Sequence, residues 1–154
     1  MRSFFAEMNR ILTNMNSDLR QLSPIDDSSS RLENMSLLLL VMGFHHGAQS
    51  VEFREIDEVF RVGERINGTL FEYPHPPIEC RTKIYSFYKT ICGSRNLWQA
   101  NLEGRTVELT FSFFAINGLD IGLRNGEDLI DRCENTLDRF WKAMGEVPNR
   151  SSRS

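Results

Sequence analysis

Histidine, cysteine and the short motifs of catalytic sites are scarce in this sequence. Its 154 residues include only three histidines and three cysteines. Cys80, Cys92 and Cys133 are odd in number and lack paired spacing, which indicates reduced thiols rather than a disulfide framework. No spacing typical of a zinc site, a phosphate loop or a nucleophile elbow occurs. The sequence therefore predicts a protein that is not an enzyme and that holds neither a metal nor a cofactor.

Long apolar segments are absent as well. The longest, SLLLLVMGF, begins at Ser36 and is much shorter than the roughly 20 residues that span a bilayer. Near the N-terminus, Glu7 and Arg10 stand where a secretory signal has an unbroken apolar run. Together with the reduced cysteines, these features predict a soluble, cytoplasmic protein.

Positive charge is limited and unevenly distributed. The formal net charge of −3 argues against a dedicated nucleic-acid binder, whose basic residues would dominate. Between residues 78 and 105, however, basic side chains outnumber acidic ones and alternate with Tyr85, Tyr88 and Trp98. This pattern favours a basic face toward the phosphate groups of RNA or toward an anionic membrane surface. The residues assigned to that face are Arg81, Lys83, Lys89, Arg95 and Arg105.

The sequence is rich in apolar periodicity. Steps of three and four predict an amphipathic helix over residues 3–22, followed by a linker, so that 1–30 form an N-terminal helix and linker. Residues 31–146 are predicted to be the globular domain and 147–154 a flexible tail. The helix stripe allows two interpretations, a lid over the core or a seam for a second copy. As a partner-binding stripe it comprises Phe4, Met8, Ile11, Leu12, Met15 and Leu19.

Two further patterns predict helices inside the globular domain. Ser30 and Glu33 form a capping box that begins a buried helix, which Gly43 is expected to cap at its C-terminus. Helical spacing returns over residues 78–93 and once more after residue 126. With the N-terminal helix, this gives about four helices.

Alternating apolar and polar residues predict the strands. Residues 51–56 have the pattern of a short edge strand. Two hairpins are expected, with turns at Asn67-Gly68 and at Asn117-Gly118. The predicted fold class is α+β, with a small, mostly antiparallel sheet of two hairpins packed against about four helices.

Three of the five prolines stand together after the first hairpin. Pro74, Pro76 and Pro77 fix an extended backbone, which predicts that a strand ends at Tyr73 and that a helix begins near Ile78. A docking motif is the other interpretation, but only one P-x-x-P frame is present. The stiff corner is therefore the favoured interpretation.

Three short segments carry a resemblance to a known family. FYK at 87–89, GSRNL at 93–97 and EGRTVELT at 103–110 resemble, in that order, segments of the matrix proteins of rhabdoviruses. The resemblance implies an α+β protein that lines the viral membrane, condenses the nucleocapsid and polymerises with itself. This chain departs from the family pattern because it has no lysine-rich N-terminus. In place of a P-P-x-Y budding motif it has the segment Pro76–Glu79.

These features together predict a non-enzymatic, self-associating structural protein of the small viral matrix type, which links nucleocapsid and membrane. Its partners would be further copies of itself, the nucleocapsid or RNA, and an anionic membrane surface, either in the cytoplasm or in a virion. The alternative is an accessory protein that docks a single host protein. A further alternative is a small enzyme or ligand-binding domain, with His45, His46 and Cys92 as its candidate residues.

Overall fold

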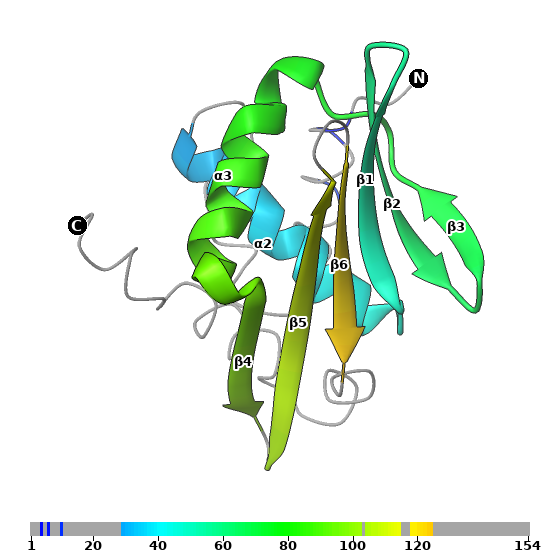
Figure 1. Ribbon diagram of the computed structural model, residues 1–154. Coiled ribbons are helices and arrows are strands. Elements are labelled where there is room, and N and C mark those ends of the chain that lie inside the picture. Colours follow the sequence, from blue (N-terminus) through cyan, green and yellow to red (C-terminus); the bar gives the residue numbers. More distant parts are fainter. Residues whose placement is uncertain are drawn as a thin grey trace.

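The structure is a computed structural model that describes residues 4, 6, 10, 29–102, 104–114 and 118–124. Six strands form one antiparallel sheet in the order β3-β2-β1-β6-β5-β4 (Figure 1). Two short 3-10 turns, η2 and η3, flank the second helix. Along the chain the elements are α2 (Ser29–His45), β1 (Ser50–Ile56), β2 (Val59–Ile66), β3 (Thr69–Glu72), η2 (Ile78–Cys80), α3 (Arg81–Cys92), η3 (Gly93–Arg95), β4 (Leu97–Leu102), β5 (Arg105–Phe114) and β6 (Gly118–Arg124).

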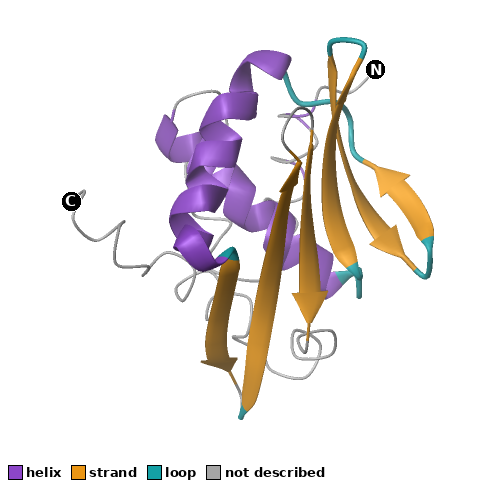
Figure 2. Cartoon of the chain, in the orientation of Figure 1, coloured by secondary structure: helices purple, strands orange, loops and turns teal. Residues whose placement is uncertain are grey.

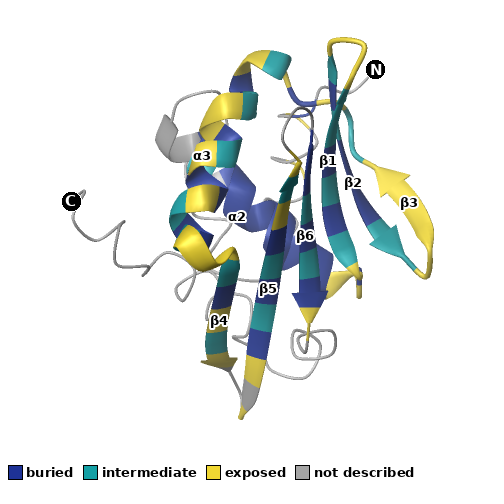
Figure 3. Cartoon of the chain, in the orientation of Figure 1, coloured by how far each residue is buried: buried dark blue, intermediate teal, exposed yellow. Residues whose placement is uncertain are grey.

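The sheet has one apolar face, which the helices cover. Successive residues of a strand point to opposite faces of the sheet. In β1, Val51 and Phe53 are therefore fully buried, whereas the alternate residues Glu52 and Arg54 stay partly exposed. α2 crosses behind the strands, and β3 lies at the end of the sheet farthest from α3 (Figure 2). Burial therefore decreases toward β3, whose four residues are all exposed (Figure 3).

The core lies between this face and the two helices. α2 is apolar almost all round, and the side chains from Leu37 to Val41 are all at most 1% exposed. Tyr88 of α3 is fully buried, and its hydroxyl donates a 2.8 Å hydrogen bond to the carbonyl of Ser36 in α2. The ring of Tyr88 also lies 5.6 Å from that of Phe53 and 6.1 Å from that of Phe111, measured between centroids. One side chain thus joins both helices to the sheet.

The expectation of a small sheet of two hairpins packed against about four helices is wrong. The sheet has six strands, and the described part of the chain contains two α-helices, of 17 and 12 residues. The helix expected over 3–22 is described only at Phe4, Ala6 and Arg10, and the one expected after residue 126 lies outside the described residues. The predicted tail at 147–154 also lies outside the described residues.

Two strands account for the larger sheet. β1 was expected at an edge because it is rich in charge, yet it pairs with both β2 and β6 at the centre. Glu52 and Arg54 are tolerated there because they point to the open face and pair with Arg65 and Asp120. Glu55 lies on the helix side and pairs with Arg81 of α3 instead. β4 was not predicted, because its inward-facing residues include the small Ala100 and its alternation is therefore weak. The hairpin of β2 and β3 turns at Asn67-Gly68, as predicted. β5 and β6 also pair, but Gly118 lies in β6 opposite Phe114 rather than in the turn, and residues 115–117 lie outside the described residues.

A pair of tyrosines on α3 tests this description of the core. Tyr88→Phe removes the hydrogen bond to Ser36 in a fully buried site, so the free energy of unfolding should fall by about 1 kcal/mol. Tyr85→Phe is the matched control: its hydroxyl oxygen is buried and has no hydrogen-bond partner in the described part of the chain. Urea unfolding of both variants should show a loss for Tyr88→Phe and none for Tyr85→Phe. Equal losses would contradict the assigned roles.

Candidate functional site

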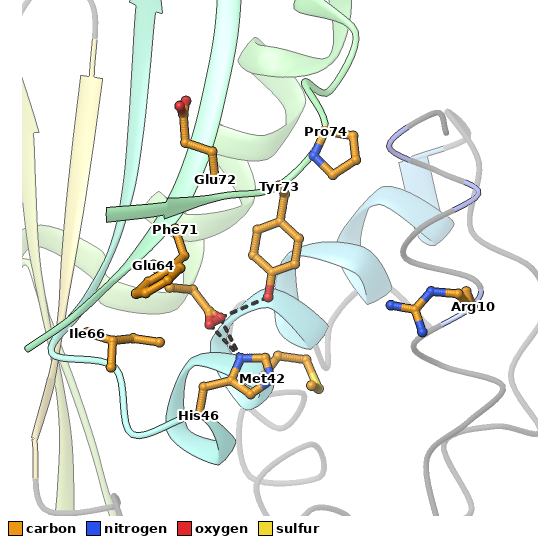
Figure 4. Close-up of a pocket in the computed structure, with 9 residues that line it drawn as sticks. All are labelled: Arg10, Met42, His46, Glu64, Ile66, Phe71, Glu72, Tyr73 and Pro74. Carbon is orange, nitrogen blue, oxygen red and sulfur yellow. Dashed lines mark hydrogen bonds and ion pairs between the residues drawn. The ribbon is translucent and has the colours of Figure 1, made fainter. Parts of the chain in front are cut away.

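A pocket of about 510 Å³ opens on the helix-bearing side of the sheet, beside β3. This volume lies in the range of small-molecule sites and would also accept one or two side chains of a partner protein. Apart from Arg10, the lining residues come from the end of α2, from β2 and from β3 with the segment after it (Figure 4). They are Arg10, Met42, His46, Glu64, Ile66, Phe71, Glu72, Tyr73 and Pro74.

A buried carboxylate stands at the wall of this pocket. Glu64 is only 3% exposed, because its position in β2 faces the helices together with Phe60 and Val62. Burying a carboxylate is costly unless hydrogen bonds replace its water. The Nδ1 atom of His46 donates to both carboxylate oxygens, at 2.6 and 2.8 Å, and the hydroxyl of Tyr73 donates to Oε2 at 2.9 Å (Figure 4). A carboxylate can only accept, so Nδ1 carries a proton.

The partnership with Glu64 changes the acidity of His46. The hydrogen bond to Glu64 raises the pKa of His46 above its ordinary value, the partial burial of the ring opposes this, and the charge of Glu64 adds to the increase. The positively charged imidazolium is therefore favoured beside the buried acid. The side chain of His46, which carries the second ring nitrogen, is 39% exposed.

The end of α2 holds His46 in place. The amide of Ala48 donates to the carbonyl of Gly43 and the amide of Gly47 to that of Phe44, at 2.9 and 3.1 Å. With Gly47 at a φ of 70°, this is a Schellman cap, in which glycine supplies the left-handed residue. The prediction that Gly43 caps the helix is wrong. Gly43 lies inside α2, where a Cβ would come within 2.7 Å of Leu123, so its small size lets the helix approach the sheet.

The other residues predicted for a small enzyme do not join this cluster. The ring of His45 lies 5.6 Å from that of His46, and the side chain is exposed. Cys92 sits on α3, where its thiol contacts the carbonyls of Lys89 and Gly93, and burial raises its pKa, which disfavours a reactive thiolate. Among the residues that the structure describes, no three potential metal ligands come together.

The predicted basic face is spread over α3 and its flanks. Arg81 forms an ion pair with Glu55 of β1, at 3.1 Å. Lys89 donates to the side chain of Asn96 at 2.6 Å and lies 5.1 Å from the ring centre of Phe113. Lys83 and Arg95 are exposed, and the side chain of Arg105 is not among those described. Arg81 and Lys83 project to nearly opposite sides of the helix, since residues two apart differ by about 200°. Contact with phosphate or membrane stays a prediction.

The predicted partner-binding stripe is described only at its first residue. Phe4 is 2% exposed and belongs to the core cluster. Met8, Ile11, Leu12, Met15 and Leu19 lie outside the described residues. The role of this helix as a seam between copies stays a prediction.

The open face of the sheet carries charge that is already compensated. Three ion pairs cross neighbouring strands on this face, and the guanidinium of Arg54 lies 4.9 Å from the ring centre of Phe114. Such partly exposed pairs stabilise the fold only slightly, but they leave little net charge to attract a ligand. The pairs join Arg65 to Glu52, Arg54 to Asp120 and Arg61 to Glu72, at 2.7, 2.7 and 2.8 Å.

Glu64, Tyr73 and the exposed edge beside them were missed in the sequence. One signal was available: in VFRVGERI the glutamate occupies the phase of Phe60 and Val62, where an acid must be buried and paired. Its partners were not identifiable, because His46 and Tyr73 reach it from a helix end and from the segment after β3. The end of β3 at Glu72 and the start of η2 at Ile78 agree with the predicted proline corner.

No protein-family model matches the chain, and no curated protein matches it either. In the described ranges, no helix has both the length and the apolar character needed to cross a membrane. The geometry of β3 and of the adjoining pocket is therefore the basis for a functional assignment.

The pair between His46 and Glu64 predicts a pH dependence of stability. A raised pKa means that the folded protein binds the proton of His46 more tightly than the unfolded chain does. The resulting stabilisation is complete below about pH 6.5, the ordinary pKa of histidine. It is lost as the pH rises through the raised pKa that His46 has in the folded protein. Urea unfolding from pH 5.5 to 8.5 should show this loss, and His46→Asn should reduce it. The control is His75→Asn, at an exposed histidine, which should keep the same loss of stability with rising pH. If His46→Asn lost stability with pH as steeply as the wild type, the assigned role of His46 would be contradicted.

Proposed function

We propose that this protein is a non-enzymatic structural protein that associates with itself through the free edge of β3. The observation that carries this proposal is an edge strand with exposed apolar side chains. All four residues of β3 are exposed, and the edge away from β2 has no strand beside it in the described sheet. The unpaired backbone groups of such an edge are a template for pairing with another chain.

Apolar exposure distinguishes β3 from the opposite edge. Large hydrophobic side chains that are exposed in the described part of the chain are Ile56, Leu70, Phe71 and Phe114, and two of these four stand on β3. At the other edge, β4 buries Trp98 and exposes Gln99 and Asn101 instead. Burial of apolar surface drives most protein association, so β3 is the edge that gains from a partner.

The wider role that we propose is that of a small viral matrix-type protein. Self-association is one property that the resemblance of segments 87–89, 93–97 and 103–110 implies. Links to the nucleocapsid and to the membrane are supported by that resemblance and by the exposed basic side chains of Lys83 and Arg95. Co-sedimentation with anionic liposomes and with RNA tests these links separately from self-association.

A second candidate function uses the same edge for a different partner. An extended segment of another protein can add to a free edge, with alternate side chains read by pockets beside it. The pocket of about 510 Å³ next to Phe71 favours this candidate, because it would accept such a side chain. The protein would then be an accessory protein that docks one host protein.

Light scattering over a concentration series tests the proposed self-association. The mass should rise from the 17.8 kDa of one chain toward that of a dimer, and salt should not reverse the rise, because the contact is apolar. Phe71→Ser should raise the dissociation constant about tenfold. Phe114→Ser, at a similarly exposed phenylalanine on β5, should leave it unchanged. A mass of one chain at every concentration would contradict self-association.

A further inference from the structure

We infer that two copies join by antiparallel pairing of β3 with β3, in the register that sets Phe71 opposite Phe71 and Leu70 opposite Glu72. This inference rests on the proposed self-association and adds its geometry. The two sheets would become one continuous sheet related by a two-fold axis between the phenylalanines, with the helices of both copies on the same face.

The first step is to identify the backbone groups that β3 leaves free. The amide of Tyr73 donates to the carbonyl of Val62, at 3.0 Å, so these two residues form a hydrogen-bonded pair. Such pairs alternate along an antiparallel ladder, which makes Phe71 with Glu64 the next one. Leu70 and Glu72 lie between them, and their amides and carbonyls therefore point away from β2.

The second step compares the registers that those groups allow. With Leu70 opposite Glu72, both amides and both carbonyls of each copy find partners. Centring on Leu70 instead would require Gly68, which has a φ of 84° and already donates to Gln49 and accepts from Arg65. Centring on Glu72 would set two glutamates face to face and would oppose Leu70 to Pro74, which has no amide hydrogen. The register centred on Phe71 avoids all three costs.

The third step follows the side chains. Phe71 points to the same side of the sheet as Glu64, its partner in the ladder, and it is 55% exposed. In the inferred register the two phenylalanines form a pair without hydrogen bonds between them, the closer kind of cross-strand pair. Each ring then covers the other beside the two pockets. On the open face, Leu70 lies beside Glu72 of the second copy, whose charge Arg61 already balances.

Disulfide cross-linking of variants with a single introduced cysteine tests this register directly. Opposed Cα atoms of a pair without hydrogen bonds are about 4.5 Å apart, within the range that a disulfide bridges. Phe71→Cys should therefore form a covalent dimer under mild oxidation. Leu70→Cys and Glu72→Cys are matched controls, since like positions would be offset diagonally by about 7–8 Å and should remain single chains. An equimolar mixture of these two variants should cross-link as a heterodimer.

The outcomes separate the register from the proposed function. Wild-type protein, oxidised in parallel, accounts for the native cysteines, of which Cys80 and Cys92 are buried. A reversible dimer with Phe71→Cys trapped at least tenfold faster than either control supports the inference. A reversible dimer in which Leu70→Cys or Glu72→Cys is trapped fastest, or in which none is, overturns the register and leaves self-association standing. A wild-type protein that stays a single chain overturns both.

Discussion

The burial of Glu64 is the constraint on which the candidate site depends. An acid on the helix-covered face of a sheet must be paired, and its partners come from two segments distant in sequence, His46 at the end of α2 and Tyr73 after β3. The carboxylate of Glu64 thus links the end of β3, through Tyr73, to the end of α2, through His46. This attachment matters because β3 has only four residues, all exposed, and its own packing supplies little stability.

An edge held in this way is suited to binding. Ordering a strand costs conformational entropy, and a strand that is already ordered by its neighbours does not incur that cost when a partner arrives. The fixed segment presents Phe71 on the side of the pocket and Leu70 on the open face, where Arg61 and Glu72 are already paired. Apolar contact and backbone pairing, rather than charge, would therefore decide which partner binds.

Single turns and helix limits could be predicted from local signals, but the six-stranded sheet and the candidate site could not. The Asn67-Gly68 turn, the proline corner and the buried helix follow from short patterns that fix backbone angles. The central position of β1 could not be read from its charged residues, because their partners Arg65 and Asp120 come from other strands. The same holds for His46, because the helix was expected to be capped at Gly43, whereas α2 ends at His45 and Gly47 supplies the cap.

Amide hydrogen exchange in β3, followed against protein concentration, tests the central claim most directly. The account predicts that the amides of Leu70 and Glu72 exchange more slowly as concentration rises. The amide of Gln99, which faces the free edge of β4 in the same manner, should exchange at a constant rate. Slowing at Gln99 without slowing at Leu70 and Glu72 would place the contact at the other edge. Exchange that is independent of concentration at all three amides would contradict association through β3.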